Sequence, residues 1–459
     1  MFPLRDKVAD HGDPQAAPDP AACRSELARL TGARYPALVR DLPPRPVWRA
    51  RTIAVSDPGP LEAFLPSGPS VAWLRRGDGM IGIGEAARLE GADPATADRW
   101  WQEFVAGIEM DSELAGVGST GPVVFASFPF DPDNTTRPSV LVVPRVVVGR
   151  RRGRAWVTWL SEHDQPDPPM PQPAADLIAR PRVVGVSGRS LDRAEWERIV
   201  AEAVTRIGRD DLSKVVLARG ARVETAEPID PRWLVGTLAA DYPSCGTYSI
   251  DGLVGASPEM LVRLEGGLAM SRVLAGTIRR NGGEELDLKL AHGLARSSKN
   301  LVEHELAVDS VAAALAPFCS GMNVPDAPYV LELPNVLHLA SDVTAVAHGG
   351  VSALRLAAEL HPSAAVCGTP TATARRAIAE LEHLDRGRYS GPVGWMEASG
   401  DGEFAIALRC GHLGADSRSI TLYAGCGIVA ESDPAEEYAE TEAKLVPMLE
   451  ALGVDVPRR

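Results

Sequence analysis

Short hydrophobic runs bounded by turn residues fill much of the second half of the chain. Runs of this length are typical of β-strands with one or both faces buried. We therefore expect strands within 213–224, 252–274, 403–413 and 420–429, the last two being paired through the turn at 415–419.

The first half of the chain shows fewer such patterns. Residues 139–160 read as strand, turn and strand, and residues 97–109 read as a helix that precedes them. Neither segment indicates a particular chemistry.

Apolar residues spaced three and four apart predict helices in the second half. In 190–208, Trp196 and Ile199 share a face, Ser190 is a candidate N-cap and Gly208 is a candidate stop. The other predicted helices are 298–318, 351–360 and 435–452. Because helices and strands do not alternate regularly, we predict an α+β fold of mostly antiparallel sheets flanked by helices.

A proline-rich segment, DQPDPPMPQP at 164–173, cannot lie inside a helix or a central strand. It separates an N-terminal part of the fold, 21–185, from a longer C-terminal region, 186–455. The first 20 residues carry four prolines and no apolar stretch, so we expect a disordered tail there.

Composition and charge exclude several classes of protein. The 459 residues are 45% hydrophobic and 24% charged, as in an ordinary globular protein with a large core. The formal net charge is −14, and the longest basic run is the Arg150–Arg152 triplet. Nucleic acid is therefore not an expected partner.

The six cysteines are scattered without CxxC pairs, which is typical of reduced thiols rather than of a metal site. No apolar run approaches twenty residues, and the N-terminus has no hydrophobic segment like that of a signal peptide. The sequence predicts a cytoplasmic protein with no membrane partner.

Two distant acidic positions are candidate metal ligands. Helix 435–452 places Glu437, Glu440 and Lys444 on one stripe, and Glu303 begins an acidic cluster on another helix. Taken alone, these patterns are more often a solvated salt bridge and an exposed acidic face. However, Mg²⁺ prefers carboxylate oxygens and keeps several waters, so Glu303 and Glu440 together form a candidate magnesium site.

Other positions could carry proton transfer or bind an anion. Lys214 lies in an apolar strand, where it either points outward at the strand's first position or faces a cleft as a general base. Glu259 would be a general acid if a closed site raised its pKa. Gly425 and Gly427 precede a helix and allow backbone N–H groups to approach an anion closely.

Eight segments occur in an order that resembles the motif series of the chorismate-utilising enzymes, and within them of the isochorismate synthases. They are SKVVLAR, GASPEML, LAGTIRR, VEHELAV, HPSAAVCGTP, GPVGWMEASGDGEFAIALRC, YAGCGIV and AETEAKL. The resemblance covers residues 190–452 closely and the N-terminal part loosely. It implies a fold like that of anthranilate synthase component I, with 186–455 as the chorismate-binding catalytic region.

The resemblance also implies residue roles. Lys214 matches the lysine that activates water for attack at ring carbon 2, and Glu259 matches the acid that protonates the hydroxyl leaving carbon 4. Glu303 and Glu440 match the ligands of Mg²⁺, which holds the ring carboxylate. Arg409 matches the arginine that binds the enolpyruvyl carboxylate. The other positions that match substrate-binding residues are Gly276, Thr277, His338, Ala365, Tyr389, Gly425 and Lys444.

Single residues discriminate between branches of this family. Ammonia-using relatives resemble this chain but carry glutamine where Lys214 stands, and one type of aminodeoxychorismate synthase carries lysine where Ala275 stands. Lys214 therefore favours water as the nucleophile, and we expect no glutaminase subunit and a monomeric enzyme. The residues before Glu303, Ser298 to Asn300, depart from the acidic pattern of siderophore-type members.

Three alternatives remain open at this point. A salicylate synthase would go further and eliminate pyruvate from isochorismate, and a catalytically inactive protein would only bind chorismate. The third alternative is the ammonia-using subunit of a two-protein synthase. The pathway served, whether menaquinone, siderophore or salicylate, is not encoded in these motifs.

Overall fold

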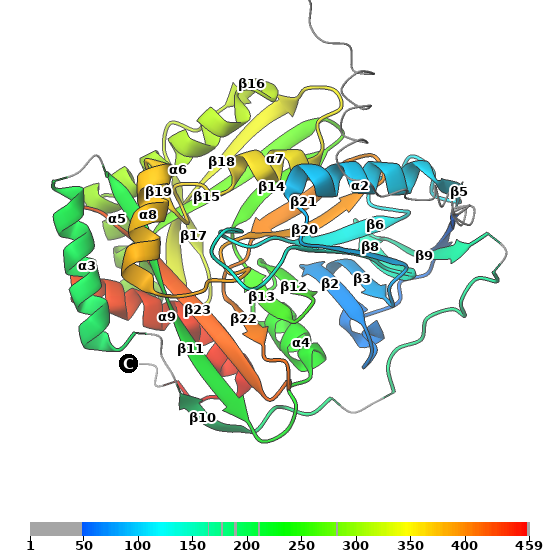
Figure 1. Cartoon of the computed structure of the whole chain (residues 1–459), viewed down its shortest axis with the longest axis horizontal. Helices are drawn as coiled ribbons and strands as arrows, with labels where there is room; N and C mark the ends of the chain where they lie inside the picture. The colour runs from blue at the N-terminus through cyan, green and yellow to red at the C-terminus, as the bar shows by residue number, and fades with distance from the viewer. Residues whose placement is uncertain are drawn as a thin grey trace, which may run out of the picture. The chain divides into compact units, whose positions relative to one another are not determined.

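The computed structural model describes residues 48–163, 165–175, 178–187, 191–209, 212–280 and 283–456. In these ranges the chain forms two large β-sheets with helices packed around them (Figure 1). Among the described strands, β1 and β5 are the only parallel neighbours. The predicted α+β fold with mostly antiparallel sheets is confirmed. The tail predicted at 1–20 lies outside the described residues.

The first sheet has 13 strands. In spatial order they are β10 (Val183–Ser187), β11 (Lys214–Thr225), β23 (Ser419–Ile428), β22 (Cys410–Leu413), β13 (Leu253–Ser257), β12 (Gly246–Ile250), β2 (Ser70–Arg75), β3 (Asp78–Ile83), β8 (Val146–Arg151), β9 (Arg154–Glu162), β1 (Trp48–Val55) and β5 (Ile108–Ser112), with β19 (Gly368–Thr369) beside β11.

The second sheet has 10 strands. In spatial order they are β16 (Cys319–Asn323), β18 (Val336–Ala347), β15 (Leu268–Arg279), β14 (Met260–Glu265), β21 (Gly402–Ile406), β20 (Pro392–Glu397), β6 (Val123–Ser127), β7 (Val140–Val143) and β4 (Ala87–Glu90), with β17 (Tyr329–Glu332) beside β18. Strands from both sides of the proline-rich segment are neighbours in each sheet, since β2 pairs with β12 and β6 pairs with β20.

Helices cover the outer faces of the two sheets. The helical segments are η1 (Leu61–Phe64), α2 (Pro94–Ala106), α3 (Arg193–Ile207), α4 (Pro231–Asp241), α5 (Glu284–Leu294), α6 (Ser298–Leu315), α7 (Ala353–Leu360), α8 (Thr371–Glu382) and α9 (Pro434–Leu452). Helices α6 and α7 pack on the second sheet, whereas α4, α8 and α9 pack on the first (Figure 1). None of the described helices is both long and apolar enough to cross a membrane.

Aspartate caps fix several helix starts. Asp93, Asp230 and Asp433 each accept backbone N–H groups of a helix whose first residue is proline. Helix α3 begins later than predicted, because Asp192 rather than Ser190 caps it through a capping box with Glu195. Ser190 lies outside the described residues.

Three predicted strand segments were wrong in one respect, because the chain changes sheet inside them. Segment 403–413 contains β21 in the second sheet and β22 in the first, so only its last residues pair with β23. Segment 252–274 likewise contains β13, β14 and part of β15, and 139–160 contains β7, β8 and β9. Both sides of each crossing are buried, so the hydrophobic pattern shows no break there.

The two sheets enclose a core between their facing surfaces. Trp73 and Tyr248 of the first sheet pack there with Phe125 and Trp395 of the second. The crossings bridge this core, and two of them, β13 to β14 and β21 to β22, place Glu259 and Arg409 in the connecting segments.

Candidate active site

One cavity gathers residues from both sheets and from helices α6 and α9. Ten of the twelve residues predicted from the sequence line it: Glu259, Gly276, Thr277, Glu303, His338, Ala365, Tyr389, Arg409, Gly425 and Lys444. The other two, Lys214 and Glu440, contact residues of this lining. The structure therefore brings together residues that are up to 230 positions apart in the sequence.

Lys214, the first residue of β11, is fully buried, so its outward-facing interpretation is wrong. Its Nζ atom lies 3.1 Å from Oε1 of Glu303, which α6 supplies. The neighbouring strand β23 leaves room for this pair at Gly427, where a Cβ atom would collide with Glu303 and come within 2.9 Å of Lys214 Cε. Glu303 is only 9% exposed, so it does not belong to an exposed acidic face.

Glu259 enters the cavity from the crossing between β13 and β14. Burial raises the pKa of its carboxyl to about 8, although the positive charges of Lys214, Arg409 and Lys444 lower it. Its carboxyl is therefore mostly protonated at neutral pH. A buried, protonated carboxyl is suited to donate a proton to a leaving group.

Arg409 lies at the second crossing and is held by a chain of hydrogen bonds. Its Nη2 donates to Nε2 of His338 at 3.1 Å, and Nδ1 of the same ring lies 3.1 Å from Thr277 Oγ1. Burial and the charge of Arg409 lower the pKa of His338, so the ring is neutral and its Nε2 accepts. Arg409 adopts φ 48°, a conformation that non-glycine residues rarely adopt.

Helix α9 presents Lys444 and Glu440 to the same cavity. Lys444 Nζ donates to the Gly425 carbonyl at 2.9 Å and to Glu440 Oε1 at 2.6 Å. The side chains of Lys444 and Glu440 are 12% and 21% exposed, so this pair is not the fully solvated salt bridge that its spacing alone suggests. A Cβ atom at Gly425 would lie 2.5 Å from the Leu217 carbonyl oxygen and 3.2 Å from Tyr389 Oη.

Two charged residues that were not predicted as site residues, Glu437 and Lys299, also belong to this part of the site. Glu437, 2% exposed, accepts a hydrogen bond of 2.6 Å from Lys299 Nζ. Burial raises the pKa of Glu437, and the charge of Glu440 adds to this effect. The available signal in the sequence was position, since Glu437 lies one turn before Glu440 on α9. Lys299 lies in the segment Ser298 to Asn300, which departs from the family pattern.

A buried ion pair supports the strand that carries Lys214. Glu382 and Arg386 are 2% and 4% exposed and bind each other, with Arg386 Nε 2.9 Å from Glu382 Oε2. Arg386 also donates to the Val216 carbonyl at 2.7 Å, and Glu382 accepts from the Ala218 N–H at 2.7 Å. These hydrogen bonds connect β11 to the last residue of α8 and to the segment that follows this helix. In sequence, the pair looks like any i,i+4 surface pair.

The cavity has a volume of only about 50 Å³. Small-molecule sites are usually several hundred Å³, so this cavity is narrow for an organic ligand. Three lysines at the site contact carboxylates: Lys214 contacts Glu303, Lys299 contacts Glu437, and Lys444 contacts Glu440. Within the described residues, no three carboxylate, imidazole or thiol groups lie close enough to hold a metal ion by themselves.

Comparison with known proteins adds an independent line of evidence. Residues 66–453 match a family described as chorismate binding enzyme. Isochorismate synthase DhbC of Bacillus subtilis is 41% identical over 273 residues, which are 57% of this chain and 68% of that protein.

Solved structures give the same result for the fold. The crystal structure of a putative 2,3-dihydroxybenzoate-specific isochorismate synthase, DhbC from Bacillus anthracis, has a TM-score of 0.71 and 30% identity, covering 86% of this chain and 99% of that one. Anthranilate synthase component I from Streptococcus pneumoniae shares the fold at a TM-score of 0.63 and 19% identity, covering 97% of this chain and all of that one. The predicted likeness to this fold is confirmed.

Proposed function

The chain belongs to the chorismate-binding enzyme family, and from this premise we propose that it is an isochorismate synthase, which converts chorismate to isochorismate. The observation that carries the proposal is one cavity that holds a protonated buried carboxyl, Glu259, together with the contact pair of Lys214 and Glu303. The reaction requires both a proton donor and a proton acceptor. A protein that only binds the substrate has no need of this arrangement.

In the proposed reaction, water attacks ring carbon 2 while the hydroxyl group leaves carbon 4. Hydroxide is a poor leaving group, so Glu259 donates its proton to the departing oxygen. Lys214 is the proposed general base, which accepts a proton from the attacking water. One proton enters the protein and one leaves it, so product and substrate have the same formula.

Arg409 and Lys444 are the proposed handles for the substrate's carboxylates. The neutral His338 accepts from Arg409 and orients it, which leaves the other guanidinium N–H groups for the enolpyruvyl carboxylate. Fixing an anionic substrate at two points holds its ring in position relative to Lys214 and Glu259.

Magnesium is part of the proposal, and the residues present fit it. Burial lowers the pKa of Lys299, but the negative charges of Glu437, Glu440 and Glu303 outweigh this effect and raise it, and the Lys299 Nζ atom lies 2.6 Å from Glu437 Oε1. Mg²⁺ needs only one or two protein carboxylates, because waters and substrate oxygens complete its shell. Glu303 and Glu440 would hold the ion, with Glu437 beside them. When bound, it would draw electron density from the ring through the substrate carboxylate.

The test is to incubate the purified protein with chorismate and to resolve the products by chromatography and mass. A new product of unchanged mass supports isochorismate synthase, whereas loss of pyruvate with formation of salicylate moves the protein to the salicylate synthases. No conversion would favour an inactive binding protein. An aminated product on addition of ammonium would identify an ammonia-using enzyme.

The roles of the acid and base are tested in the same assay. We expect Lys214→Ala and Glu259→Gln each to lower turnover by a factor on the order of 10² or more, because general acid or base catalysis contributes about that much. Lys289→Ala, a change at an exposed lysine of α5, is the matched control and should leave turnover unchanged. Normal turnover in either site variant would remove that residue from its role.

The metal is tested by binding as well as by activity. We expect Glu440→Ala to weaken the binding of Mn²⁺, followed by electron paramagnetic resonance, and to raise the Mg²⁺ concentration needed for half-maximal activity. Glu436→Ala, at an exposed position on the same helix, should change neither. Unchanged titrations in Glu440→Ala would exclude this residue from the metal site. A cytoplasmic location and a monomeric state stay predictions, to be checked by cell fractionation and light scattering.

A further inference from the structure

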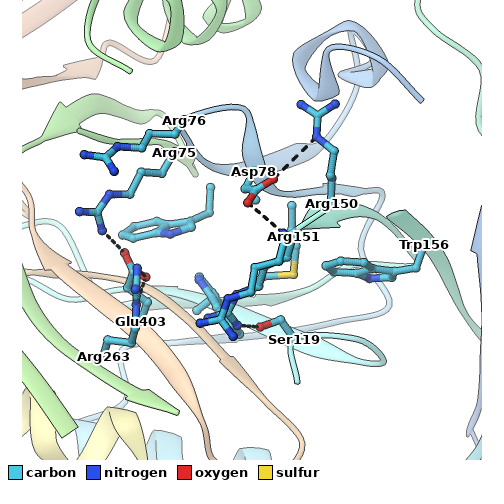
Figure 2. A pocket seen from close by; sticks show the side chains of 14 residues that line it. Arg75, Arg76, Asp78, Ser119, Arg150, Arg151, Trp156, Arg263 and Glu403 are labelled. Atoms are coloured by element: carbon cyan, nitrogen blue, oxygen red, sulfur yellow. Dashed lines mark hydrogen bonds and ion pairs between the residues drawn. The ribbon is translucent and has the colours of Figure 1, made fainter. Parts of the chain in front are cut away.

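A second hollow, separate from the active site, lies between strands of the two sheets. Its volume is about 270 Å³, and it shares no lining residue with the first cavity. Strands β2, β3, β8 and β9 of the first sheet and β14, β20 and β21 of the second supply most of the wall. Figure 2 shows side chains entering it from several directions.

Arginine dominates the lining of this hollow. Six arginines line it, against two carboxylates, Asp78 and Glu403: Arg75, Arg76, Arg150, Arg151, Arg152 and Arg263. The whole chain has a formal net charge of −14, so this local excess of positive charge runs against the rest of the molecule. Concentrated positive charge in a concave site attracts anions.

The carboxylates present do not neutralise the arginines. Glu403 binds both Arg75, at 3.3 Å, and Arg263, at 2.6 Å, as Figure 2 shows. Glu265, outside the lining, likewise serves both Arg151 and Arg152. Arg150, in contrast, contacts two carboxylates, Asp57 at 2.7 Å and Asp78 at 3.9 Å. Four carboxylates in total therefore contact five of the six arginines.

The side chain of Arg76 has no hydrogen bond or ion pair with any described residue, whereas its backbone N–H donates to the Pro243 carbonyl at 2.8 Å. It follows Arg75 at the end of β2 and has φ 53°, a left-handed conformation that residues other than glycine rarely adopt. Desolvation lowers the pKa of Arg75, and the charges of Arg263, Arg272 and Arg76 lower it further against the opposing effect of Glu403. The guanidinium groups therefore repel one another in the absence of a ligand.

Tryptophans form much of the remaining wall. Trp73, Trp156 and Trp395 line the hollow, and the indole N–H groups of Trp156 and Trp395 are buried without a hydrogen-bond partner. The indole rings supply flat, largely apolar surface beside the arginines. A ligand with several acidic oxygens would supply acceptors for the guanidinium N–H groups.

We propose that this hollow is a binding site for a small polyanion, a compact molecule with two or more carboxylate or phosphate groups. The arginine forks would bind the acidic groups in bidentate fashion, and the tryptophan rings would cover the remainder of the molecule. A volume of about 270 Å³ suits a compact molecule. The site is independent of the proposed reaction, because it lies apart from Glu259, Lys214 and Arg409.

Isothermal titration calorimetry with two probes, inorganic pyrophosphate and citrate, tests the proposal in metal-free buffer. We expect one molecule of probe to bind per chain. Tighter binding of pyrophosphate would indicate a phosphate ligand, and tighter binding of citrate would indicate a carboxylate ligand. In the double variant Arg76→Gln/Arg151→Gln, affinity should fall at least about tenfold, because two charged donors are lost while Glu265 keeps its contact with Arg152.

Two control variants locate the binding. Arg198→Gln, an exposed arginine on α3, should bind the probes like the original protein. Arg409→Gln should also retain binding, which separates this site from the anion handles of the active site. The single variant Arg76→Gln removes no contact within the fold, so it remains informative if the double variant does not fold. Absence of binding, binding that survives in Arg76→Gln/Arg151→Gln, or binding lost in Arg409→Gln would overturn the proposal.

Discussion

Glu259 illustrates how burial turns an ordinary carboxyl into an acid that works near neutral pH. Its pKa is raised from 4.5 to about 8 by burial, against three nearby positive charges. Because the unfolded chain releases the proton at the lower pKa, the folded state holds more protons between about pH 4.5 and pH 8. Stability contributed by this group is therefore complete below pH 4.5 and is lost as the pH rises towards 8.

We predict that Glu259→Gln removes this pH dependence. The melting temperature of the variant, relative to that of the original protein, should increase steadily from pH 5 to pH 8. Thermal denaturation across this range provides the measurement, with Glu285→Gln at an exposed position of α5 as a control whose curve follows the original protein. Parallel curves for Glu259→Gln and the original protein would show that the carboxyl is not protonated in the folded state.

Gly427 shows a second effect at the residue scale, the space required by the contact pair of Lys214 and Glu303. A methyl group there would collide with the Glu303 carboxylate and crowd Lys214 Cε. We predict that Gly427→Ala lowers kcat/KM at least about tenfold, since displacement of a catalytic group by about 1 Å has effects of that size or larger. Steady-state kinetics is the measurement.

Gly236→Ala is the matched control for this change, because a Cβ atom there meets nothing within 4 Å. It should leave the kinetics intact and stabilise helix α4 by up to about 1 kcal/mol. If Gly427→Ala also left kcat/KM unchanged, the activity would not depend on the present position of Lys214 and Glu303.

At the scale of the element, β11 depends on α8 as well as on its neighbouring strands. The buried pair of Glu382 and Arg386 binds the Val216 carbonyl and the Ala218 N–H, close to Lys214. We predict that Arg386→Met destabilises the protein by about 3–5 kcal/mol, since loss of one partner leaves a buried carboxylate unpaired. Urea denaturation should show this as a lower midpoint.

The double variant Arg386→Met/Glu382→Gln separates two explanations of that loss. It should recover part of the stability, because it removes the unpaired charge together with its partner. If it were no more stable than Arg386→Met, packing of the arginine side chain rather than charge would account for the effect. Arg206→Met, which breaks partly exposed pairs with Glu202 on α3 and Glu380 on α8, should cost less than about 1 kcal/mol.

Prediction from sequence worked best for elements and motifs that carry a local signal. The helices α6, α7 and α9 begin or end within a few residues of the predicted bounds, and ten of the twelve predicted site residues line one cavity. Changes of sheet inside a hydrophobic run were not predictable, because residues on both sides of the crossing are buried. The pair of Glu382 and Arg386 was missed for a similar reason, since i,i+4 spacing does not report depth.

At the scale of the whole molecule, residues 47–459 cluster as one compact unit despite the proline-rich segment. Strand β2 pairs with β12 and strand β6 with β20, so each side of the segment supplies partners to the other. The arginine hollow is a product of this arrangement, since Arg75 and Arg151 come from before the segment and Arg263 from after it. No local pattern in the sequence predicts such convergence.

We predict that neither side of the proline-rich segment folds alone. Fragments 1–170 and 171–459 expressed separately should be insoluble or molten, because each would expose strand edges and half of the core between the sheets. Co-expression should restore a soluble complex with chorismate-dependent product formation. A folded fragment 171–459, seen by dispersed amide signals in NMR spectra, would contradict this prediction.

The sheet crossings have a consequence for substrate range. Glu259 and Arg409 lie where two segments pass between the sheets. The distance between the proposed proton donor and the proposed carboxylate-binding residue therefore depends on the spacing of the sheets. Tyr248 belongs to the packing that sets this spacing, and its hydroxyl donates to the Leu408 carbonyl, 3.1 Å away and next to Arg409. A protein engineered to accept a larger or smaller ring should therefore be redesigned in the interior around Tyr248. Substitutions in the cavity wall alone would leave the distance between Glu259 and Arg409 unchanged.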